Sequence, residues 1–279
     1  MSANVMRFKA RIKELAKEEN IPAQVVLQNF MFERFFARLG KSSTRENFVL
    51  KGGTLISQYL GISRRTTMDI DITLRNAALT EKTITEMING VFSIDLGDGI
   101  AWSLGSIAPI RDDDQYGGFR VKVVSRLESI VVPFSIDVST GDAITPEPEN
   151  YFFKSLFVQN ETFRLKAYTI ETIIAEKIEA ILSLGTTSTR PRDYYDAFML
   201  TTVVRHSTER LTAAVLATAV HRQSRMNLAN WQTTMNEIEH SEIMNSRWAK
   251  YQREFSFAQD LSFAQICQHL TKLLRELDL

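Results

Sequence analysis

Two aspartates separated by one residue are the first feature of the sequence that suggests chemistry. Asp69 and Asp71 lie in residues 67–74, where apolar and polar side chains alternate. This alternation predicts a strand with both carboxylates on one face and their Cα atoms roughly 6.5–7 Å apart. At that separation the two side chains can bind one divalent ion, or flank a pair of metal ions about 4 Å apart. A solvated acidic face of an amphipathic strand has the same pattern, so the pair alone does not distinguish a metal site from an ordinary surface strand.

A third carboxylate follows in a second alternating segment. In residues 130–138 Asp137 falls on the face opposite Phe134 and Ile136. If this strand lies beside the first, Asp137 joins the same acidic face and completes a two-metal centre; otherwise it only begins the next turn. Asp142, in the following loop, is a weaker candidate for that role. Ligand sets made only of oxygen atoms favour Mg²⁺ or Mn²⁺ over Zn²⁺.

A glycine-rich turn precedes the aspartate pair. It follows a short apolar run and precedes a predicted helix over residues 54–60. Paired glycines let backbone N–H groups approach a phosphate, and a helix N-terminus adds partial positive charge. Many such dipeptides are only turns, but its place one helix upstream of the aspartates favours a phosphate site. We therefore expect a triphosphate to bind at Lys51, Gly52, Gly53 and Thr54.

A lysine interrupts the apolar stripe of a later helix. Lys177 lies within residues 170–184, among isoleucines at helical spacing. A lysine on a core-facing stripe is costly unless its ammonium group is paired, although a lysine at the edge of the stripe can extend to solvent. In the next helix Asp196 is a plausible partner, whereas Asp193 near the N-terminus suits a purely capping role.

Two arginines begin that next helix. Arg190 and Arg192 flank Pro191, which fits a first helical turn. Arginine binds phosphate through two parallel hydrogen bonds, so both are candidates for a nucleotide site.

The elements that carry these residues form a consistent order. Helices are predicted over residues 4–40 and 80–92, and several strands within 100–138, among them 119–125 and 129–138. A polar, proline-rich loop covers 141–150, and from 169 onward the pattern is helical except for a break at 185–189. We expect an α/β (α+β) core with a mixed sheet over residues 1–160 and a mainly helical C-terminal domain over residues 161–279.

Composition excludes several classes of protein. The 279 residues contain 33 Lys+Arg and 33 Asp+Glu, so a polycationic nucleic-acid binder is excluded, although basic residues exceed acidic ones between Arg34 and Arg75. The single cysteine, Cys267, excludes an internal disulfide and a cysteine zinc cluster. No apolar stretch approaches the roughly 18 residues of a membrane span, and no leader pattern is visible. We expect a cytoplasmic protein.

Taken together, four motifs resemble the AbiEii/AbiGii toxin family, nucleotidyltransferase-like proteins of type IV toxin–antitoxin and abortive-infection (phage-resistance) systems. The motifs are residues 51–54, 68–71, 175–177 and 192–196, and the resemblance runs from about residue 25 to about 205. It implies a polymerase-β-like nucleotidyltransferase core, a helical C-terminal domain and a cognate antitoxin encoded nearby. In this family the first motif is often Gly-Ser; here it is Gly-Thr, which keeps the hydroxyl.

The resemblance also implies roles for individual residues. Gly53 and Thr54 would hold the triphosphate, Asp69 and Asp71 would bind metal, and Lys177 with Asp196 would form the downstream motif. The expected reaction transfers a nucleoside monophosphate from an NTP to an acceptor hydroxyl, at the 3′ end of tRNA, and so blocks translation. The alternatives are transfer to a small molecule or a protein, and a non-catalytic NTP-binding protein on the same scaffold.

Overall fold

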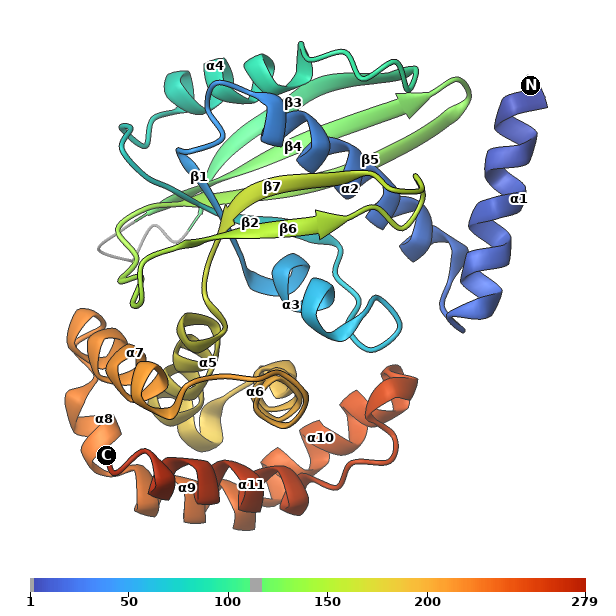
Figure 1. Ribbon diagram of the computed structural model, residues 1–279. Coiled ribbons are helices and arrows are strands. Elements are labelled where there is room, and N and C mark those ends of the chain that lie inside the picture. The colour runs from blue at the N-terminus through green and yellow to red at the C-terminus, as the bar shows by residue number, and fades with distance from the viewer. Residues whose placement is uncertain (1–2, 111–116) are drawn as a thin grey trace. The chain divides into compact units, whose positions relative to one another are not determined.

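The computed structural model describes residues 3–110 and 117–279 (Figure 1). Residues 111–116, inside the region where several strands are expected, lie outside the described residues. The chain divides into two compact units. The first comprises residues 1–142 and 149–167, and the second comprises residues 143–148 and 168–279.

A seven-stranded mixed sheet forms the first unit, in the order β3-β4-β5-β2-β1-β7-β6. Its strands are β1 (Phe48–Lys51), β2 (Asp69–Leu74), β3 (Ile100–Ile110), β4 (Gly118–Leu127), β5 (Ile130–Ser139), β6 (Glu149–Lys154) and β7 (Thr162–Ala167). β2 runs parallel to β5, and β1 runs parallel to β7, while the other neighbouring pairs are antiparallel. The strand with Asp137 is therefore the direct neighbour of the strand with Asp69 and Asp71.

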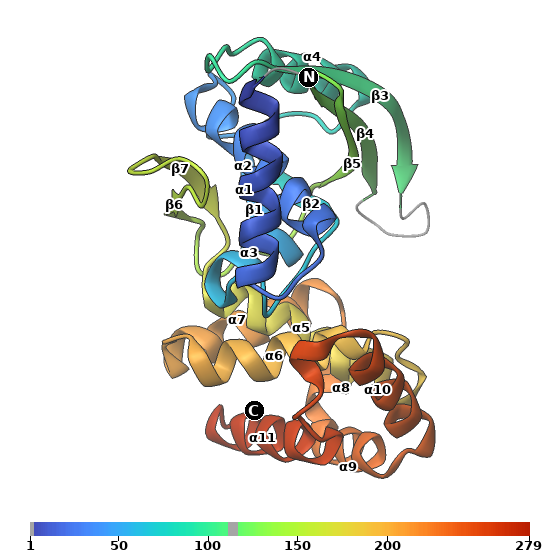
Figure 2. The same cartoon turned by 90° about the vertical axis from the view of Figure 1, so that its right-hand side faces the viewer.

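Helices pack against this sheet, except for the first, which packs on the second. They are α1 (Ala3–Glu18), α2 (Ala23–Lys41), α3 (Gly52–Leu60) and α4 (Glu81–Phe92). α2 packs against β5 and β7, α4 packs against β3, and α3 packs against β1 and β2. Figure 2 shows α1 and α2 with β3, β4 and β5 to one side and β6 and β7 to the other. The apolar residues of the alternating strands pack here, as in the pair Phe32 and Phe134, whose ring centroids are 5.1 Å apart.

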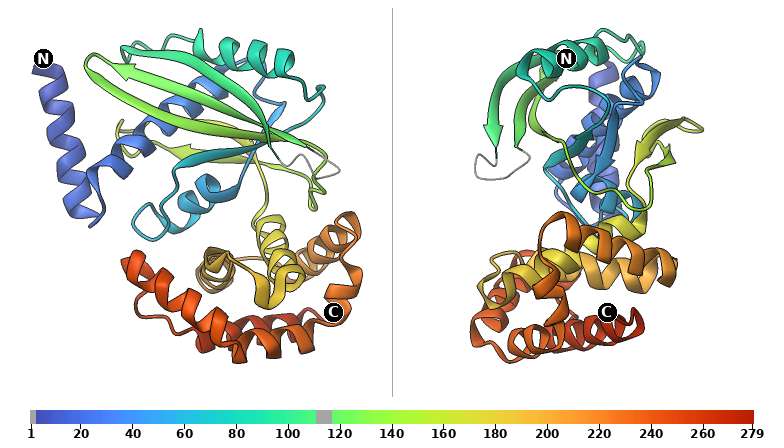
Figure 3. Two further views of the ribbon diagram at one scale, coloured as in Figure 1. Left: turned by 180° about the vertical axis from the view of Figure 1, so that it is seen from behind. Right: turned by 90° about the vertical axis from the view of Figure 1, so that its left-hand side faces the viewer.

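The second unit is helical. It contains α5 (Ile170–Leu184), α6 (Pro191–Val203), α7 (Thr208–His221), α8 (Arg225–Ala229), α9 (Trp231–His240), α10 (Glu242–Glu254) and α11 (Phe263–Glu276). The hydroxyl of Thr169 caps α5 by accepting a hydrogen bond from the Thr172 N–H. α5 packs against α6 and α7, and α9 lies beside α11 (Figure 3). Residues 143–148 join this unit, and the Thr172 hydroxyl donates to the carbonyl of Thr145 at 2.8 Å.

The structure confirms the predicted fold class, with a mixed α/β core followed by helices. It adds β6 and β7, which the sequence did not predict. In β6 the run Tyr151-Phe152-Phe153 is continuously aromatic and hides the two-residue period. No helix in the described part of the chain is long and apolar enough to cross a membrane.

Candidate active site

Four charged residues form one row across four adjacent strands. The strand register pairs Arg120 of β4 with Asp137 of β5, Asp137 with Asp71 of β2, and Asp71 with Lys51 of β1. Asp69 lies two residues from Asp71 and therefore on the same face. The opposite face of these strands carries the apolar core, so the alternation in the sequence separates the core from the charged row.

The turn between β1 and α3 brings the glycine motif against Asp71. The N–H of Gly53 donates to Oδ2 of Asp71 at 3.2 Å. Gly52 has φ of +61°, and a Cβ at this position would lie 2.0 Å from the same oxygen. A side chain is excluded there by both backbone conformation and space. Glycine at position 52 is thus what allows the turn and the carboxylate to meet.

The Thr54 hydroxyl ties the start of α3 to the aspartate strand. It donates to the carbonyl oxygen of Asp69 at 2.8 Å, and its side chain is almost completely buried. The Thr67 hydroxyl contacts the same carbonyl and also Oδ1 of Asp69, at 3.3 Å. These contacts fix the backbone at the first aspartate, while Thr54 itself points into the protein.

Burial and like charges raise the pKa of Asp71. Burial is the largest cause, and the neighbouring carboxylates of Asp69 and Asp137 add to it. The charge of Lys51 and the hydrogen bond from Gly53 act in the opposite direction. Lys51 and the Gly53 N–H do not fully offset burial and the negative charge of the neighbouring aspartates. A divalent cation bound here would supply the missing positive charge.

Asp137 is held by Arg120. Nε and Nη2 of Arg120 donate to its two carboxylate oxygens at 2.7 and 2.6 Å. These hydrogen bonds, with the charge of Asp137, raise the pKa of Arg120 still further. Within the described residues, no group of three His, Cys, Asp or Glu side chains is arranged to hold a metal ion. Asp69 and Asp71 supply the oxygen atoms that a hard cation prefers, whereas both carboxylate oxygens of Asp137 accept hydrogen bonds from Arg120.

Lys51 is directed inward. Its Nζ donates to Oδ2 of Asp142 at 2.5 Å and to the hydroxyl of Ser139 at 2.7 Å. Asp142 also accepts from the hydroxyl of Thr73 at 2.7 Å. In this arrangement Lys51 connects the loop after β5 to β1 and β2. Asp142, the weaker candidate for the third carboxylate, is bound to Lys51.

The second unit contains a separate cluster around Lys177. Its Nζ lies 2.6 Å from Oδ1 of Asp193 and 3.3 Å from Oδ2 of Asp196. Arg190 also contacts Asp193, with Nε 2.9 Å from Oδ2. Asp196 is completely buried, as is nearly all of Asp193. The sequence identified Asp196 as a partner but assigned Asp193 only a capping role; their spacing of three residues, which puts both on one helix face, was the available signal.

Arg192 faces a different neighbour. Its guanidinium carbon lies 4.9 Å from the ring centroid of Phe255, directly after α10, so it takes part in a cation–π contact. The structure thus brings together Arg190, Lys177 and the two aspartates, but not Arg192.

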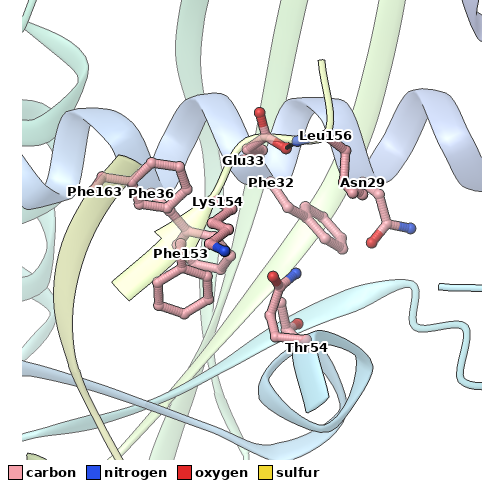
Figure 4. Close-up of a pocket in the computed structure, with 10 residues that line it drawn as sticks. Asn29, Phe32, Glu33, Phe36, Thr54, Phe153, Lys154, Leu156 and Phe163 are labelled. Carbon is pink, nitrogen blue, oxygen red and sulfur yellow. Dashed lines mark hydrogen bonds between the residues drawn. The ribbon is translucent and has the colours of Figure 1, made fainter. Parts of the chain in front are cut away.

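A small pocket lies near α3 in the first unit (Figure 4). Side chains from α2, α3 and the segment from β6 to β7 line it, among them Phe32, Phe36, Phe153 and Phe163. Glu33, at its edge, accepts a hydrogen bond from the Leu156 N–H at 2.9 Å, and burial raises its pKa. Of the residues predicted for nucleotide binding, only Thr54 lines this pocket.

A family model described as "Nucleotidyl transferase AbiEii toxin, Type IV TA system" matches residues 34–269. A search of curated proteins finds no match. Among solved structures, JHP933 from Helicobacter pylori is 16% identical, with 91% of each chain covered and a TM-score of 0.48. A candidate nucleotidyltransferase from the same bacterium is 15% identical, covering 92% of this chain and 96% of that chain at a TM-score of 0.49. An antigenic nucleotidyltransferase-like protein from Paracoccidioides brasiliensis is 14% identical, covering 73% of this chain and 91% of that chain at a TM-score of 0.41.

Proposed function

Since the chain belongs to the AbiEii family of nucleotidyltransferase toxins, we propose that it transfers a nucleoside monophosphate from an NTP to the 3′-terminal hydroxyl of an RNA, with tRNA as the acceptor. In this reaction the acceptor oxygen forms a bond to the α-phosphorus. The bond from that phosphorus to the bridging oxygen breaks, and pyrophosphate leaves. Modified tRNA ends would then block translation.

The meeting of the glycine turn with the aspartate strand supports this proposal most directly. The Gly53 N–H lies 3.2 Å from Asp71, so a group bound at the turn would also lie beside the carboxylates. α3 begins at Gly52, which adds the partial positive charge of a helix N-terminus. Phosphoryl transfer requires such a combination of phosphate-binding amides and negatively charged cation ligands.

Asp69 and Asp71 would hold Mg²⁺ or Mn²⁺, with Asp137 as a third ligand. The ion would neutralise the developing charge on the triphosphate and orient it. Gly52 and the α3 N-terminus would bind the phosphates through the backbone, and the Gly53 N–H would join them on leaving Asp71. Lys51 would favour the ionised form of Asp71 without contacting the phosphates, since its charge opposes the rise in the pKa of that carboxyl group.

Lys177 remains a proposed catalytic cation of the second unit. Its contacts with Asp193 and Asp196 would keep the ammonium group in one position. Arg190, whose side chain is 57% exposed, would offer a further cation for phosphate. Membership of a type IV toxin–antitoxin family implies an antitoxin partner, and we expect it to be encoded nearby.

The test combines purified protein, Mg²⁺, total bacterial tRNA and each α-labelled NTP in turn. We expect label on tRNA with one or two of the NTPs, and its loss in both Asp69→Asn and Asp71→Asn. Asp260→Asn, at an exposed position of the second unit, is the matched control and should retain activity. Circular dichroism and melting curves would verify that each variant is folded.

Three results would contradict the proposal. Full activity in either aspartate variant would exclude the metal role. Label on a small molecule or protein but not on RNA would show that RNA is not the acceptor. Tight NTP binding without pyrophosphate release under any condition would favour a binding protein.

A further inference from the structure

The hairpin of β6 and β7 has an outer face with an unusual composition. The register places Asn150 opposite Lys166, Phe152 opposite Arg164, and Lys154 opposite Thr162. These six residues, which we call the hairpin face, alternate with the buried residues of the two strands. All are exposed except Lys166, which is half-buried. The hairpin forms one edge of the sheet, with β6 outermost (Figure 1).

Packing of the hairpin against the core does not require Phe152. The inner face is anchored by Phe153 and Phe163, whose stacked rings are 5.3 Å apart, and by contact of Phe153 with Phe36 of α2. Phe152 points the other way and is 66% exposed. A single exposed apolar residue is ordinary on protein surfaces. Phe152 differs because cations surround it on both strands.

The charge of the hairpin face is positive. Lys154, Arg164 and Lys166 belong to it, and none of these three forms an ion pair with another described residue. Glu161, directly before β7, is bound by Arg34 of α2, and Glu149 at the start of β6 pairs with Ala167 on the opposite face of the hairpin. An exposed aromatic ring among cations on a sheet surface is typical of single-stranded nucleic-acid sites, where bases stack on the ring and phosphates contact the cations.

We propose that the hairpin face binds the single-stranded end of the RNA acceptor. One base stacks on Phe152, and Arg164 and Lys166 contact the phosphates beside it. The Asn150 amide and the Thr162 hydroxyl offer hydrogen bonds to base edges or to 2′-hydroxyl groups. This inference rests on the proposed function for the identity of the ligand, but binding can be measured without transfer.

The experiment measures binding of the full chain to a 5′-fluorescein-labelled single-stranded RNA of about twelve nucleotides by fluorescence anisotropy. Phe152→Ala should weaken binding about tenfold, while Phe152→Tyr, which keeps a stacking ring, should bind like the wild type. The double variant Arg164→Ala/Lys166→Ala should reduce the slope of log K against log salt by about 1.4. Val131→Ala and Lys82→Ala, exposed apolar and basic positions elsewhere in the first unit, are the controls.

Several results would overturn the inference. Wild-type affinity in Phe152→Ala would exclude stacking, and an equal loss in Val131→Ala would show an unspecific effect. Competition by polyglutamate as strong as by unlabelled RNA would indicate a general polyanion site, and failure of the wild type to bind the RNA would exclude the site altogether.

Transfer measurements separate this inference from the proposed function. If both hold, Phe152→Ala raises KM for RNA and leaves kcat unchanged. Transfer that is insensitive to Phe152→Ala would support the function and contradict the hairpin face. Phe152-dependent RNA binding without any transfer would support the hairpin face and contradict the function.

Discussion

Arg120 and Asp137 face each other across β4 and β5, joined by two contacts of 2.7 and 2.6 Å between guanidinium nitrogens and carboxylate oxygens. The pair stands at one end of a row that continues through Asp71 to Lys51. An arginine therefore donates hydrogen bonds to both oxygens of the carboxylate that would serve as the third cation ligand. Binding of a metal ion to Asp137 must compete with this guanidinium group.

Replacing Arg120 should strengthen metal binding. In Arg120→Gln the competing charge is lost, and we expect Mn²⁺ to bind about fivefold more tightly, measured by isothermal titration calorimetry without nucleotide. Asp137→Asn should weaken binding. Arg126→Gln, at an exposed position on the same strand, is the control and should leave the affinity unchanged. Unchanged affinity in Asp137→Asn would show that Asp137 is not a ligand.

Alanine at position 52 should destabilise the first unit. Gly52→Ala combines a positive φ with a close approach to Asp71, and we expect the free energy of unfolding to fall by at least about 2 kcal/mol. Gly90 in α4 is a matched control, because nothing lies within 4 Å of an added Cβ. Gly90→Ala should raise stability by about 0.5–1 kcal/mol, since alanine favours a helix. Equal effects of the two variants in urea unfolding would contradict this account.

Neutralising Lys177 should destabilise the second unit. Lys177→Met keeps the length of the side chain but leaves two buried carboxylates without their shared cation, and we expect a loss of about 3–5 kcal/mol. Adding Asp196→Asn should recover part of that loss, because one buried negative charge is removed. Chemical denaturation of the single and double variants measures both effects. A single variant as stable as the wild type would show that the carboxylates do not depend on Lys177.

Acid should weaken the contact between α2 and the loop before β3. Burial alone would raise the pKa of Asp98, but hydrogen bonds from Arg38 and from the Ile100 N–H outweigh it and hold the pKa below 3.8. The stabilising effect of Asp98 is thus fully present above pH 3.8 and is lost as the pH falls through the folded-state pKa. At neutral pH Asp98→Asn should cost about 2 kcal/mol. Urea midpoints between pH 3 and pH 6 should show this difference shrinking towards acid; a constant difference would refute the assignment.

The single thiol should be unreactive in the folded protein. Cys267 lies in α11 and is completely buried, and burial followed by the charge of Glu239 raises its pKa to about 12. Because the thiolate is the reactive form, a maleimide should label the native chain at pH 8 only through unfolding. In denaturant, labelling should be complete within minutes. Rapid labelling of the native protein would contradict the burial of α11.

Local pattern made part of the site predictable. The two-residue period in residues 67–74 identified β2 and the shared face of Asp69 and Asp71, and the same period put Asp137 on the matching face of β5. Helical spacing placed Lys177 in an apolar stripe and Asp196 in the next helix. Each of these conclusions depends on neighbours in the chain, where side-chain direction follows from backbone geometry.

Partners that are distant in the sequence were not predictable in this way. The residues around Lys51 in the sequence do not indicate that its ammonium group will pair with Asp142. Those around Asp137 do not indicate that Arg120 will bind its carboxylate. Both pairings follow from strand order and from how a loop closes, which local periodicity does not contain. β6 was missed for a local reason, since the aromatic run around Phe152 hides the alternation that the finished hairpin displays.

The order of the sheet also bears on how the chain folds as it is synthesised. β1 is among the first strands made, yet one of its edges is filled by β7, with Leu50 paired to Ala167. A nascent chain that ends at Asp142 would present that edge unpaired, a state that favours aggregation and chaperone binding. Residues 143–148 would be made before α5, the helix that they contact, because α5 follows β7. The first unit is therefore completed only when synthesis has reached Ala167, directly before the helices of the second unit.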